Sequence, residues 1–448
     1  MRPEQENFIT SDINSLRKVL VHPLGAERRH IVPRFGFVAR QGFSADLLGA
    51  AAEQQHKIFT ETLSAQGVKV ISTYDLINNA LANLKKEGRL ERYIEEHFPK
   101  VALLLKETGE LAADDLIGAS DRAFYRFFGT KHAPASRPLS AMFFTRDLAV
   151  TVPEGVVLTS FNNKRSFETK LVRLMFDWSD QLHEVPIVFD AEREHVHVQG
   201  GDIIVHDEKT LFMGVDNASE RAAASLMAKK LNKMVIAVKL PSPKSFLAHA
   251  GGSLGSLMLH LDTVFNIVDT KKALVMPYFF ENAFADQNPL YSIVGGAVPA
   301  QSVRGFLRRG LYGLNEKRLR RELAKVGTVT IFEAGSGKEI DTSLKLVDFL
   351  KSEFGYEIIF VGGTPPTLFE DRVKHIVEVV IPETHFQAGN VFALRPGEVL
   401  IYKENTEYTQ QALHKAGIKI ILFEGYELAR WRGGPHCMTM PLKRRGQN

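Results

Sequence analysis

A repeated order of strands and helices is the feature that most constrains the fold of this chain. In each copy, a short strand carrying a polar residue leads to a hairpin, then to an amphipathic helix and an apolar strand. Apolar runs between Gly, Pro and Asp turns indicate the strands, and apolar residues at a 3.6-residue period indicate the helices. Repetition of one such unit is typical of radial or solenoid assembly. The three clearest copies begin at Thr145-Arg146-Asp147, Gly200-Gly201-Asp202 and Gly389-Asn390.

The expected boundaries follow the same order in these three copies. The first has strands Ala149–Pro153 and Val156–Thr159, helix Phe167–Trp178 and strand Pro186–Phe189. The second has strands Ile203–His206 and Thr210–Val215, helix Ala222–Leu231 and strand Met234–Leu240. The third has strands Val391–Arg395 and Glu398–Tyr402, helix Thr409–Ala416 and strand Ile418–Phe423.

Two looser copies bring the total to about five units. One comprises strand Leu16–His22, helix Leu47–Gln66 and strand Val68–Thr73. The other begins at His260-Leu261-Asp262, with strands Val264–Val268, Ala273–Met276, Thr328–Phe332 and Tyr356–Val361 and helix Thr342–Phe354. We therefore predict a single α/β domain over residues 1–448.

The segment between the unit that ends at Thr73 and the unit that begins at Thr145 differs in texture. Helical runs occupy 76–84, 90–98 and 101–107, without a convincing strand, and the segment ends among the prolines at 134–138. We therefore expect a helical subdomain inserted at residues 75–137. The irregular stretch Tyr278–Arg304 is expected to be either a loop near the site or a long connection.

Composition narrows the class of protein. The chain has 448 residues, of which 44% are hydrophobic and 24% charged, as in globular proteins with a large core. Its net charge is +4 and its charges are mixed, so we expect no nucleic-acid partner and interpret the run Lys443-Arg444-Arg445 as a solvated tail. A polar N-terminus and the lack of an apolar run near the ~20 residues of a membrane span predict a cytoplasmic protein without a membrane partner.

One cysteine, Cys437, confines any thiol chemistry to a single position. This excludes an internal disulfide framework and fits a reducing compartment. A lone cysteine is usually a small buried hydrophobe. However, Gly433-Gly434-Pro435 predicts a turn with exposed N–H groups, and Arg432 and His436 add positive potential, which favours a thiolate.

Several polar side chains complete a candidate site. His260 and Asp262 would share one face of a strand, offering an acid/base and an anion, or else a buried histidine bonded to its neighbour. Asp147 follows an apolar segment and would either cap a turn or bind a guanidinium together with Asp262. Gln199 precedes Asp202 at a hairpin entrance and lies on the face of His195 and His197. These two histidines lack further ligands in sequence, so we expect neither a metal nor another cofactor.

At this point the chain resembles the arginine deiminase family of guanidino-group-modifying enzymes. The resemblance runs from Leu16 to the cysteine loop and is carried by segments in the family's order. They are Phe144-Thr145-Arg146-Asp147, Gly200-Gly201-Asp202, His260-Leu261-Asp262-Thr263, Ala393-Leu394-Arg395-Pro396-Gly397 and Arg432–Leu442. The resemblance implies a five-bladed α/β propeller with a helical insertion.

The resemblance also implies a mechanism and a substrate. Cys437 would attack the guanidinium carbon of arginine, and His260 would protonate ammonia and then activate water to release citrulline. Asp147 and Asp262 would hold the guanidinium, and Gln199 would contact His260. The residues assigned to substrate binding are Phe144, Arg165, Asp202 and Arg432. A small guanidino compound is thus the expected partner, and the sequence leaves open whether the chain forms a homo-oligomer.

Three positions depart from the family pattern. Gln199 replaces a Glu, which removes a negative charge that would keep His260 protonated. Ala141 replaces a substrate-contacting Asn, and Ala218 replaces a substrate arginine for which Arg221 would compensate if the local path differs. These departures keep two alternatives to arginine hydrolysis. One is the same covalent chemistry on another guanidino or ureido compound, or amidino transfer to an amine; the other is a guanidine-binding homologue without catalysis.

Overall fold

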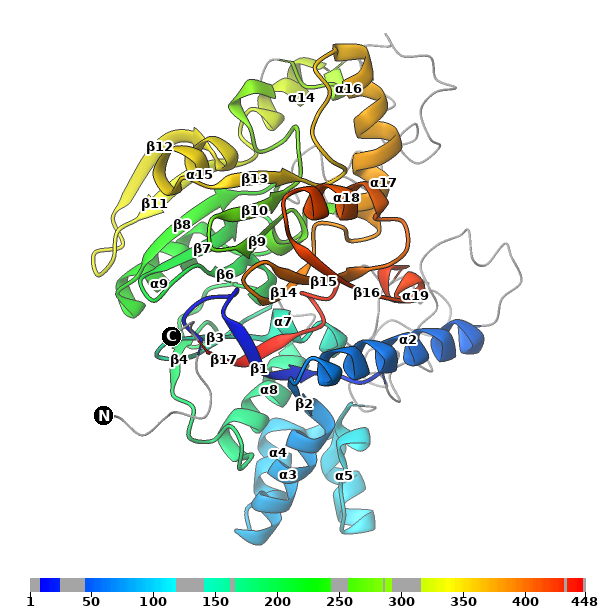
Figure 1. Cartoon of the computed structure of the whole chain (residues 1–448). Helices are drawn as coiled ribbons and strands as arrows, with labels where there is room; N and C mark the ends of the chain where they lie inside the picture. Colours follow the sequence, from blue (N-terminus) through cyan, green and yellow to red (C-terminus); the bar gives the residue numbers. More distant parts are fainter. Residues whose placement is uncertain are drawn as a thin grey trace.

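The computed structural model describes residues 9–24, 45–117, 141–161, 166–242, 257–284, 287–291, 316–430 and 433–445. Within these ranges the strands form five sheets, arranged with helices around them in a mixed α/β fold (Figure 1). In four of the five sheets, a central strand pairs antiparallel with one neighbour and parallel with the other. The fifth sheet has the same arrangement with two added strands.

The strand boundaries lie close to those expected from sequence. The first sheet contains β17 (Met440–Arg445), β1 (Ser15–Val21) and β2 (Lys69–Ser72). The second contains β3 (Ala149–Val152), β4 (Gly155–Leu158) and β5 (Ile187–Asp190). Another contains β9 (Phe265–Asp269), β10 (Lys272–Val275) and β13 (Glu357–Phe360). The last three-stranded sheet contains β14 (Phe392–Arg395), β15 (Glu398–Tyr402) and β16 (Lys419–Phe423).

The five-stranded sheet differs from the prediction. It contains β6 (Ile203–Val205), β7 (Thr210–Val215), β8 (Met234–Lys239), β11 (Thr328–Phe332) and β12 (Glu339–Lys345). We expected β11 in the sheet of β9 and β10, but it pairs antiparallel with β8 and satisfies backbone groups that an edge strand would leave open. The helix expected from Thr342 begins only at Leu346, because residues through Lys345 continue the hairpin with β11.

The two ends of the described chain meet in one sheet. β17 pairs antiparallel with β1, although more than 400 residues separate them in sequence (Figure 1). The prediction of a solvated basic tail at 443–445 is therefore wrong for the backbone, which forms a paired strand, and for Arg444, although Arg445 is exposed. Arg444 is buried, donates from Nη1 to the Asn14 carbonyl at 2.7 Å and lies over the Phe392 ring.

Most of the helices lie around these sheets (Figure 1). The longer ones are α2 (Ala45–Ala65), α3 (Thr73–Lys86), α4 (Leu90–His97), α5 (Pro99–Thr108), α8 (Ser166–Trp178), α9 (Arg221–Leu231), α14 (Glu316–Leu323), α15 (Leu346–Phe354) and α18 (Glu407–Lys415). Short ones are α7 (Thr145–Leu148), α16 (Phe369–His375), α17 (Ile381–His385) and α19 (Tyr426–Arg430), with a π-helical turn at Ile376–Val380. No helix among the described residues is long and apolar enough to cross a bilayer.

Helices α3, α4 and α5 occupy the region where a helical insertion was expected. They extend away from the sheets (Figure 1) and are anchored to α8 and the turn after it. Asn79 and Asn83 each donate to the Asp180 carboxylate at 2.8 Å, and a shared apolar cluster includes Leu81 and Leu174. Of the irregular stretch 278–304, the structure describes turns and a one-turn helix through 284 and residues 287–291, and the rest lies outside the described residues.

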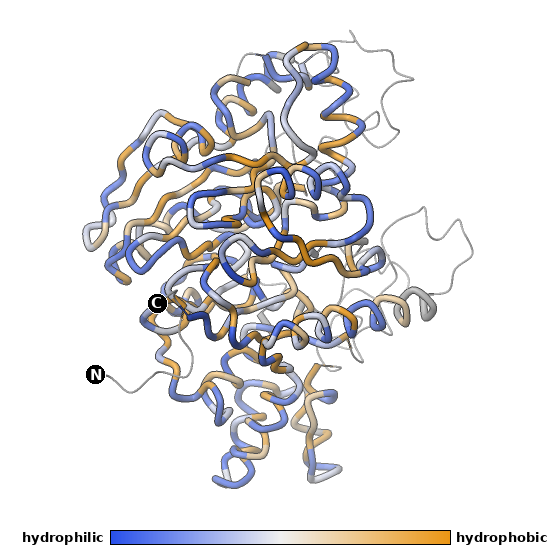
Figure 2. Tube along the Cα trace, in the orientation of Figure 1, coloured by the Kyte–Doolittle hydropathy of each residue, from blue (hydrophilic) through white to orange (hydrophobic). Residues whose placement is uncertain are grey.

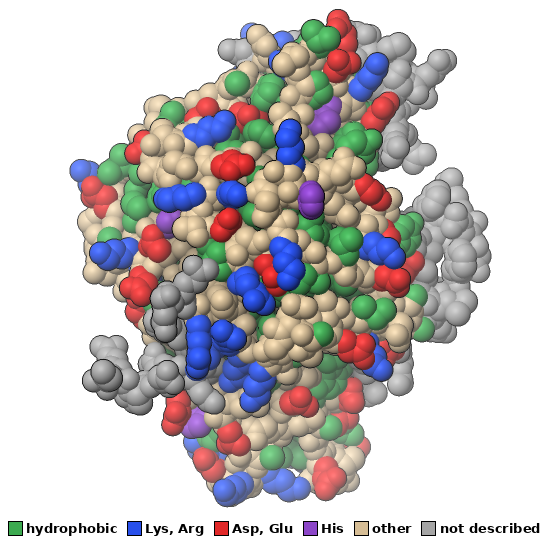
Figure 3. Space-filling view, in the orientation of Figure 1, with side chains coloured by type: hydrophobic (Ala, Val, Ile, Leu, Met, Phe, Trp, Pro, Cys, Tyr) green, Lys and Arg blue, Asp and Glu red, His purple; other side chains and the backbone are tan. Residues whose placement is uncertain are grey.

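Apolar side chains concentrate along the strands. The hydrophobic colour in Figure 2 follows the central sheets, while the outer faces of the helices are hydrophilic. On the face shown in Figure 3, acidic and basic side chains are interspersed, with a local gathering of basic groups close to the C-terminus. The expected mixed charge pattern therefore holds on this face of the molecule.

Candidate active site

Three of the predicted polar segments are single helical turns. We expected short strands at Thr145-Arg146-Asp147, Gly200-Gly201-Asp202 and His260-Leu261-Asp262, but the structure has α7 and two 3-10 turns, at Gly200–Asp202 and Leu261–Thr263. The expectation that His260 and Asp262 share one face of a strand is therefore wrong. Side-chain hydroxyls satisfy carbonyls of the turns, since Thr263 donates to the His260 carbonyl at 2.7 Å and Thr159 to that of Asp147 at 2.8 Å. Each turn leads directly into a strand, so its polar residues lie at the strand entrances.

Cys437 lies in a tight turn before β17. It is buried, and its N–H donates to the Asn390 side-chain oxygen at 2.9 Å. Its Sγ lies 3.6 and 3.9 Å from the two carboxylate oxygens of Asp262. A Cβ at Gly434 would come within 2.5 Å of the Asn390 oxygen, so this close approach requires a glycine. The structure thus brings Cys437 and Asp262 together.

Asp262 is fully buried and receives several hydrogen bonds near its turn. Its Oδ2 lies 2.8 Å from His436 Nδ1, and its backbone carbonyl accepts from the Asn390 and Asn266 amides at 2.9 and 2.7 Å. Burial, followed by repulsion from Asp147, raises the pKa of Asp262 to about 8. This carboxyl group can therefore hold a proton near neutral pH.

The thiol is neutral in this arrangement. Burial, followed by the charges of Asp262 and Asp147, raises the pKa of Cys437 well above its usual range. Burial, followed by Arg146 and Arg444, lowers the pKa of His436 well below its usual value, so this imidazole carries no charge. The expectation that His436 would favour a thiolate is therefore wrong, because desolvation outweighs sequence proximity.

His260 is clamped between an amide and a carboxylate. Its Nε2 lies 2.7 Å from Gln199 Oε1, and its Nδ1 lies 3.5 Å from Asp147 Oδ1. A Cβ at Gly201 would come within 2.7 Å of the imidazole Nδ1, so only glycine allows the ring to lie there. Asp147 therefore acts on two groups of the site. It contacts the imidazole of His260, and its charge repels that of Asp262, the carboxylate beside Cys437.

Asp202 fastens the segment that carries Gln199 to the turn that carries His260. One carboxylate oxygen accepts from Ser219 Oγ at 2.5 Å, and the other accepts from the Leu261 N–H at 3.0 Å. Ser219 Oγ in turn accepts from the Gln199 N–H at 3.0 Å. Asp202 is fully buried and connects the two turns through these hydrogen bonds. Its part in substrate binding stays a prediction.

Comparison with known proteins identifies the family of this chain. The family model described as arginine deiminase matches residues 91–289 and 375–444, more than half of the chain. The chain belongs to the arginine deiminase family. The curated arginine deiminase of Metamycoplasma arthritidis is 27% identical, with 98% of this chain and 96% of that protein covered. The one of Listeria monocytogenes (strain HCC23) is also 27% identical, with 99% of each chain covered.

A solved structure supports the fold separately. An amidinotransferase from Microseira wollei, from a saxitoxin biosynthetic pathway, has a TM-score of 0.50 at 14% identity, with 98% of each chain covered. At this level of identity, the likeness concerns the mixed α/β fold and not the reaction.

Not every residue expected from the arginine deiminase family can be placed. Arg165 and Arg432 lie outside the described residues. Phe144 lies against the cysteine turn, where a Cβ at Gly433 would come within 2.1 Å of its ring. Arg221 does not replace the arginine missing at Ala218, because it pairs with Glu339 and donates to Thr330 at 2.8 Å.

Sequence reasoning gave Asn390 and Arg146 no role in this site and gave His436 a wrong one. Asn390 holds the N–H of Cys437, while His436 and Arg146 lie behind Asp262. His436 and Arg146 each adjoin a predicted catalytic residue, so adjacency was the available signal. For Asn390 the signal was its position shortly before β14, because Asp202 and Asp262 lie in the corresponding turns before β6 and β9.

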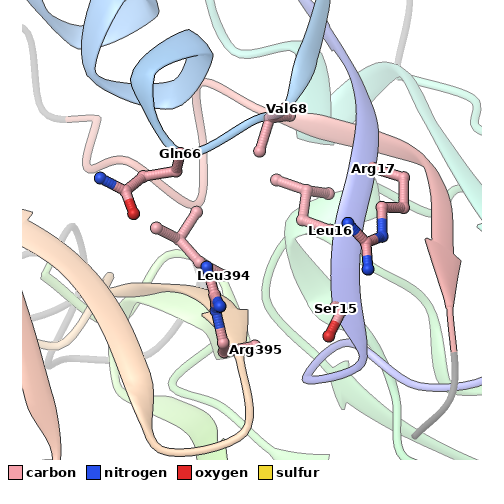
Figure 4. A pocket seen from close by; sticks show the side chains of 7 residues that line it. All are labelled: Ser15, Leu16, Arg17, Gln66, Val68, Leu394 and Arg395. Atoms are coloured by element: carbon pink, nitrogen blue, oxygen red, sulfur yellow. The ribbon is translucent and has the colours of Figure 1, made fainter. Parts of the chain in front are cut away.

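Outside this site, the rest of the described residues form a small pocket but no cluster of metal ligands. Among the described residues, no cluster of three or more His, Cys, Asp or Glu could hold a metal ion. A small pocket lies between β1, the end of α2 and β14 (Figure 4). It is lined by Ser15, Leu16, Arg17, Gln66, Val68, Leu394 and Arg395, and none of these is a predicted site residue.

Proposed function

We propose that this protein hydrolyses L-arginine to L-citrulline and ammonia through a covalent intermediate on Cys437. One observation carries the proposal: the only thiol of the chain and the His260–Asp147 pair lie in the same buried site. The Sγ of this thiol lies 3.6 Å from Asp262 Oδ2. Membership of the arginine deiminase family supports the same chemistry.

A cationic substrate suits the charge of this site. Burial, followed by repulsion from Asp147, raises the pKa of Asp262. A guanidinium between them would relieve this repulsion and lower the pKa of both Asp262 and Cys437. The substrate itself would thereby favour the thiolate that attacks it.

The proposed reaction balances with groups on this chain. The thiol proton leaves towards Asp262, and Cys437 Sγ then bonds to the guanidinium carbon. The C–N bond breaks as His260 donates a proton to the departing ammonia, which leaves a thiouronium. His260 then accepts a proton from water, and the water oxygen bonds to the same carbon. The C–S bond breaks as Asp262 returns its proton to the sulfur, and the hydroxyl proton passes to the released ammonia as the citrulline carbonyl forms.

Product analysis tests the proposal directly. We expect the purified protein to form citrulline and ammonia from arginine in equal amounts. A haloacetamidine probe should add one adduct per chain, on Cys437, because the chain has no other thiol. Arginine left intact by a protein that also resists this probe would refute the proposal.

Replacement of the nucleophile is the first variant to measure. Cys437→Ala should abolish turnover, while arginine still binds in calorimetry because Asp147 and Asp262 remain. Met438→Leu, a volume-conserving change at the buried neighbour, is the matched control and should retain activity. Undiminished turnover in Cys437→Ala would rule out covalent catalysis.

A second candidate substrate is favoured by the position of Arg221. Its pairing with Glu339 leaves Ala218 without the compensating cation expected for an arginine carboxylate. The same covalent chemistry would then act on a guanidino or ureido compound without that carboxylate, or transfer the amidino group to an amine. Competition of arginine against a panel of alkylguanidines distinguishes the candidates by kcat/KM.

We also propose that the five sheets are the blades of an α/β propeller. Their shared strand order and the pairing of β17 with β1 support a ring closed by the chain ends. Residues 75–137 would form a helical subdomain inserted in a single domain that spans 1–448. An experimental structure with the sheets in an open row would refute this architecture.

A further inference from the structure

A chain of buried polar side chains leads from the N-terminal segment to the proposed site. Arg146 Nη2 lies 3.2 Å from Asp12 Oδ1 and 3.1 Å from His436 Nε2. His436 Nδ1 lies 2.8 Å from Asp262 Oδ2. The side chains of Asp12, Arg146, His436 and Asp262 are at most 6% exposed, so water screens these contacts little.

The chemistry of arginine fixes the direction of these hydrogen bonds. A guanidinium has donors and no acceptor, so His436 Nε2 must accept from Arg146. The neutral imidazole then carries its proton on Nδ1 and donates it to Asp262 Oδ2. Arg146 thereby selects the His436 tautomer that supports an ionised Asp262.

Asp12 fixes Arg146 from the opposite side. Its second carboxylate oxygen accepts from the Val205 N–H at 2.8 Å, and its own N–H donates to the Val205 carbonyl at 2.8 Å. The carboxylate is therefore held against the end of β6. The Arg146 N–H also donates to the Cys437 carbonyl at 3.1 Å, so the same residue is tied to the nucleophile turn.

We infer that Asp12 and Arg146 are positioning residues that act through His436 to orient the Asp262 carboxylate, and that Arg146 favours its ionised form for a cationic substrate while Asp12 moderates that effect. This inference rests on the proposed function. Arg146 is a cation that opposes the effect of burial on Asp262, and the charge of Asp12 partly cancels that of Arg146.

Other charged and titratable groups also face Asp262 and enter the same balance. Asp147 on α7 and Asp202 before β6 oppose its ionisation, and the Cys437 thiol donates towards it. Arg444 on β17 is a second cation that acts on His436. Of these groups, Arg146 and Asp12 can be changed without touching a residue assigned to the reaction.

The test uses paired substitutions with opposite expected directions. Arg146→Gln removes the cation, so the acidic limb of the pH profile of kcat/KM for arginine should move up by about one pH unit. At pH 7 this shift lowers kcat/KM roughly tenfold, mainly because KM rises. Asp12→Asn retains an oxygen acceptor but removes the anion that offsets Arg146, so the limb should move to lower pH. Arg146→Lys retains the charge and should restore the limb.

Alkylation of Cys437 gives a second readout that does not need turnover. Because the chain has one thiol, the rate of reaction with iodoacetamide reports this site alone. Arg146→Gln should move the pH profile of alkylation upwards and Asp12→Asn downwards. Asp207→Asn, which alters the His206–Asp207 pair in the turn after β6, is the matched control and should leave both profiles in place.

The outcomes separate the two proposals. If the wild-type protein converts no guanidino compound, the proposed function fails, and the alkylation profiles still test the role of Arg146 and Asp12. Folded Arg146→Gln and Asp12→Asn proteins with unmoved profiles would overturn the inference, as would shifts in the same direction. If Arg146→Gln does not fold, the direction of the Asp12→Asn shift decides.

Discussion

Two His–Asp pairs in this molecule have nearly the same geometry and opposite chemistry. His436 and Asp262 lie 2.8 Å apart, and His206 and Asp207 lie 2.7 Å apart. The side chain of Asp262 is fully buried, whereas that of Asp207 is 49% exposed. Burial raises the pKa of Asp262 to about 8. Partial burial also raises the pKa of Asp207, but hydrogen bonds from His206 and the Lys209 N–H outweigh it and lower the value to about 2.

The difference teaches that the surroundings of the pair, and not the contact itself, determine its chemistry. Asp207 accepts two hydrogen bonds in a half-exposed turn, which stabilise its charge. Asp262 also accepts from a histidine, but it lies beside Asp147 and the Cys437 thiol in a desolvated site. A carboxyl group of this kind is poised to exchange a proton when a cation arrives.

The largest expected effect is a contrast in activity between the two pairs. Asp262→Asn should lower kcat/KM for arginine by at least about a hundredfold, because a buried charged partner of the cation is lost. Asp207→Asn should leave kcat/KM unchanged within twofold. Steady-state kinetics on both variants make the measurement. Equal losses would show that the exposed pair also serves the reaction and would break the comparison.

Much of the architecture could be predicted from the sequence because it depends on local patterns. β15 lies exactly where its apolar run predicted, and α9 begins one residue earlier than expected. The partner of β11 could not be predicted, because an apolar strand carries no information about which sheet edge is open. The burial of Arg444 was equally hidden, since it depends on pairing with β1 across the whole chain.

The second prediction concerns the histidine whose partner is an amide. Gln199→Glu would place a carboxylate at the 2.7 Å contact with His260, which should raise the pKa of the imidazole by about 1–3 units. We expect roughly tenfold higher kcat/KM towards arginine at neutral pH and an alkaline limb moved upwards. Gln66→Glu in the pocket of Figure 4 makes the same chemical change away from the site as a control. Lower activity in Gln199→Glu would show a site built around a neutral amide.

The residues of the site were more predictable than their electrostatics. Cys437, His260, Asp147 and Asp262 could be named because each lies in a short polar segment next to an apolar strand. The charge state of Cys437 could not, because neighbours in sequence suggested positive potential while Asp262 and Asp147 supply the opposite in space. Nothing in the sequence indicated that Asp12 belongs near the site, since its side chain is connected to the site through Arg146.

The smallest expected effect is on the pH dependence of stability, where the two pairs should differ in sign. The pKa of Asp262 is higher in the folded chain than the unfolded value of about 3.9, so its contribution favours folding at low pH and is lost as pH rises towards 8. Asp207 has a lowered pKa, so its contribution is present above pH 4 and is lost as pH falls through about 2. Between pH 5 and 8, the free energy of unfolding of Asp262→Asn should therefore rise relative to that of the wild type, whereas Asp207→Asn should show a constant loss below about 1 kcal/mol. Urea denaturation at several pH values measures both slopes, and parallel slopes would mean that Asp262 is ionised throughout this range in the folded protein.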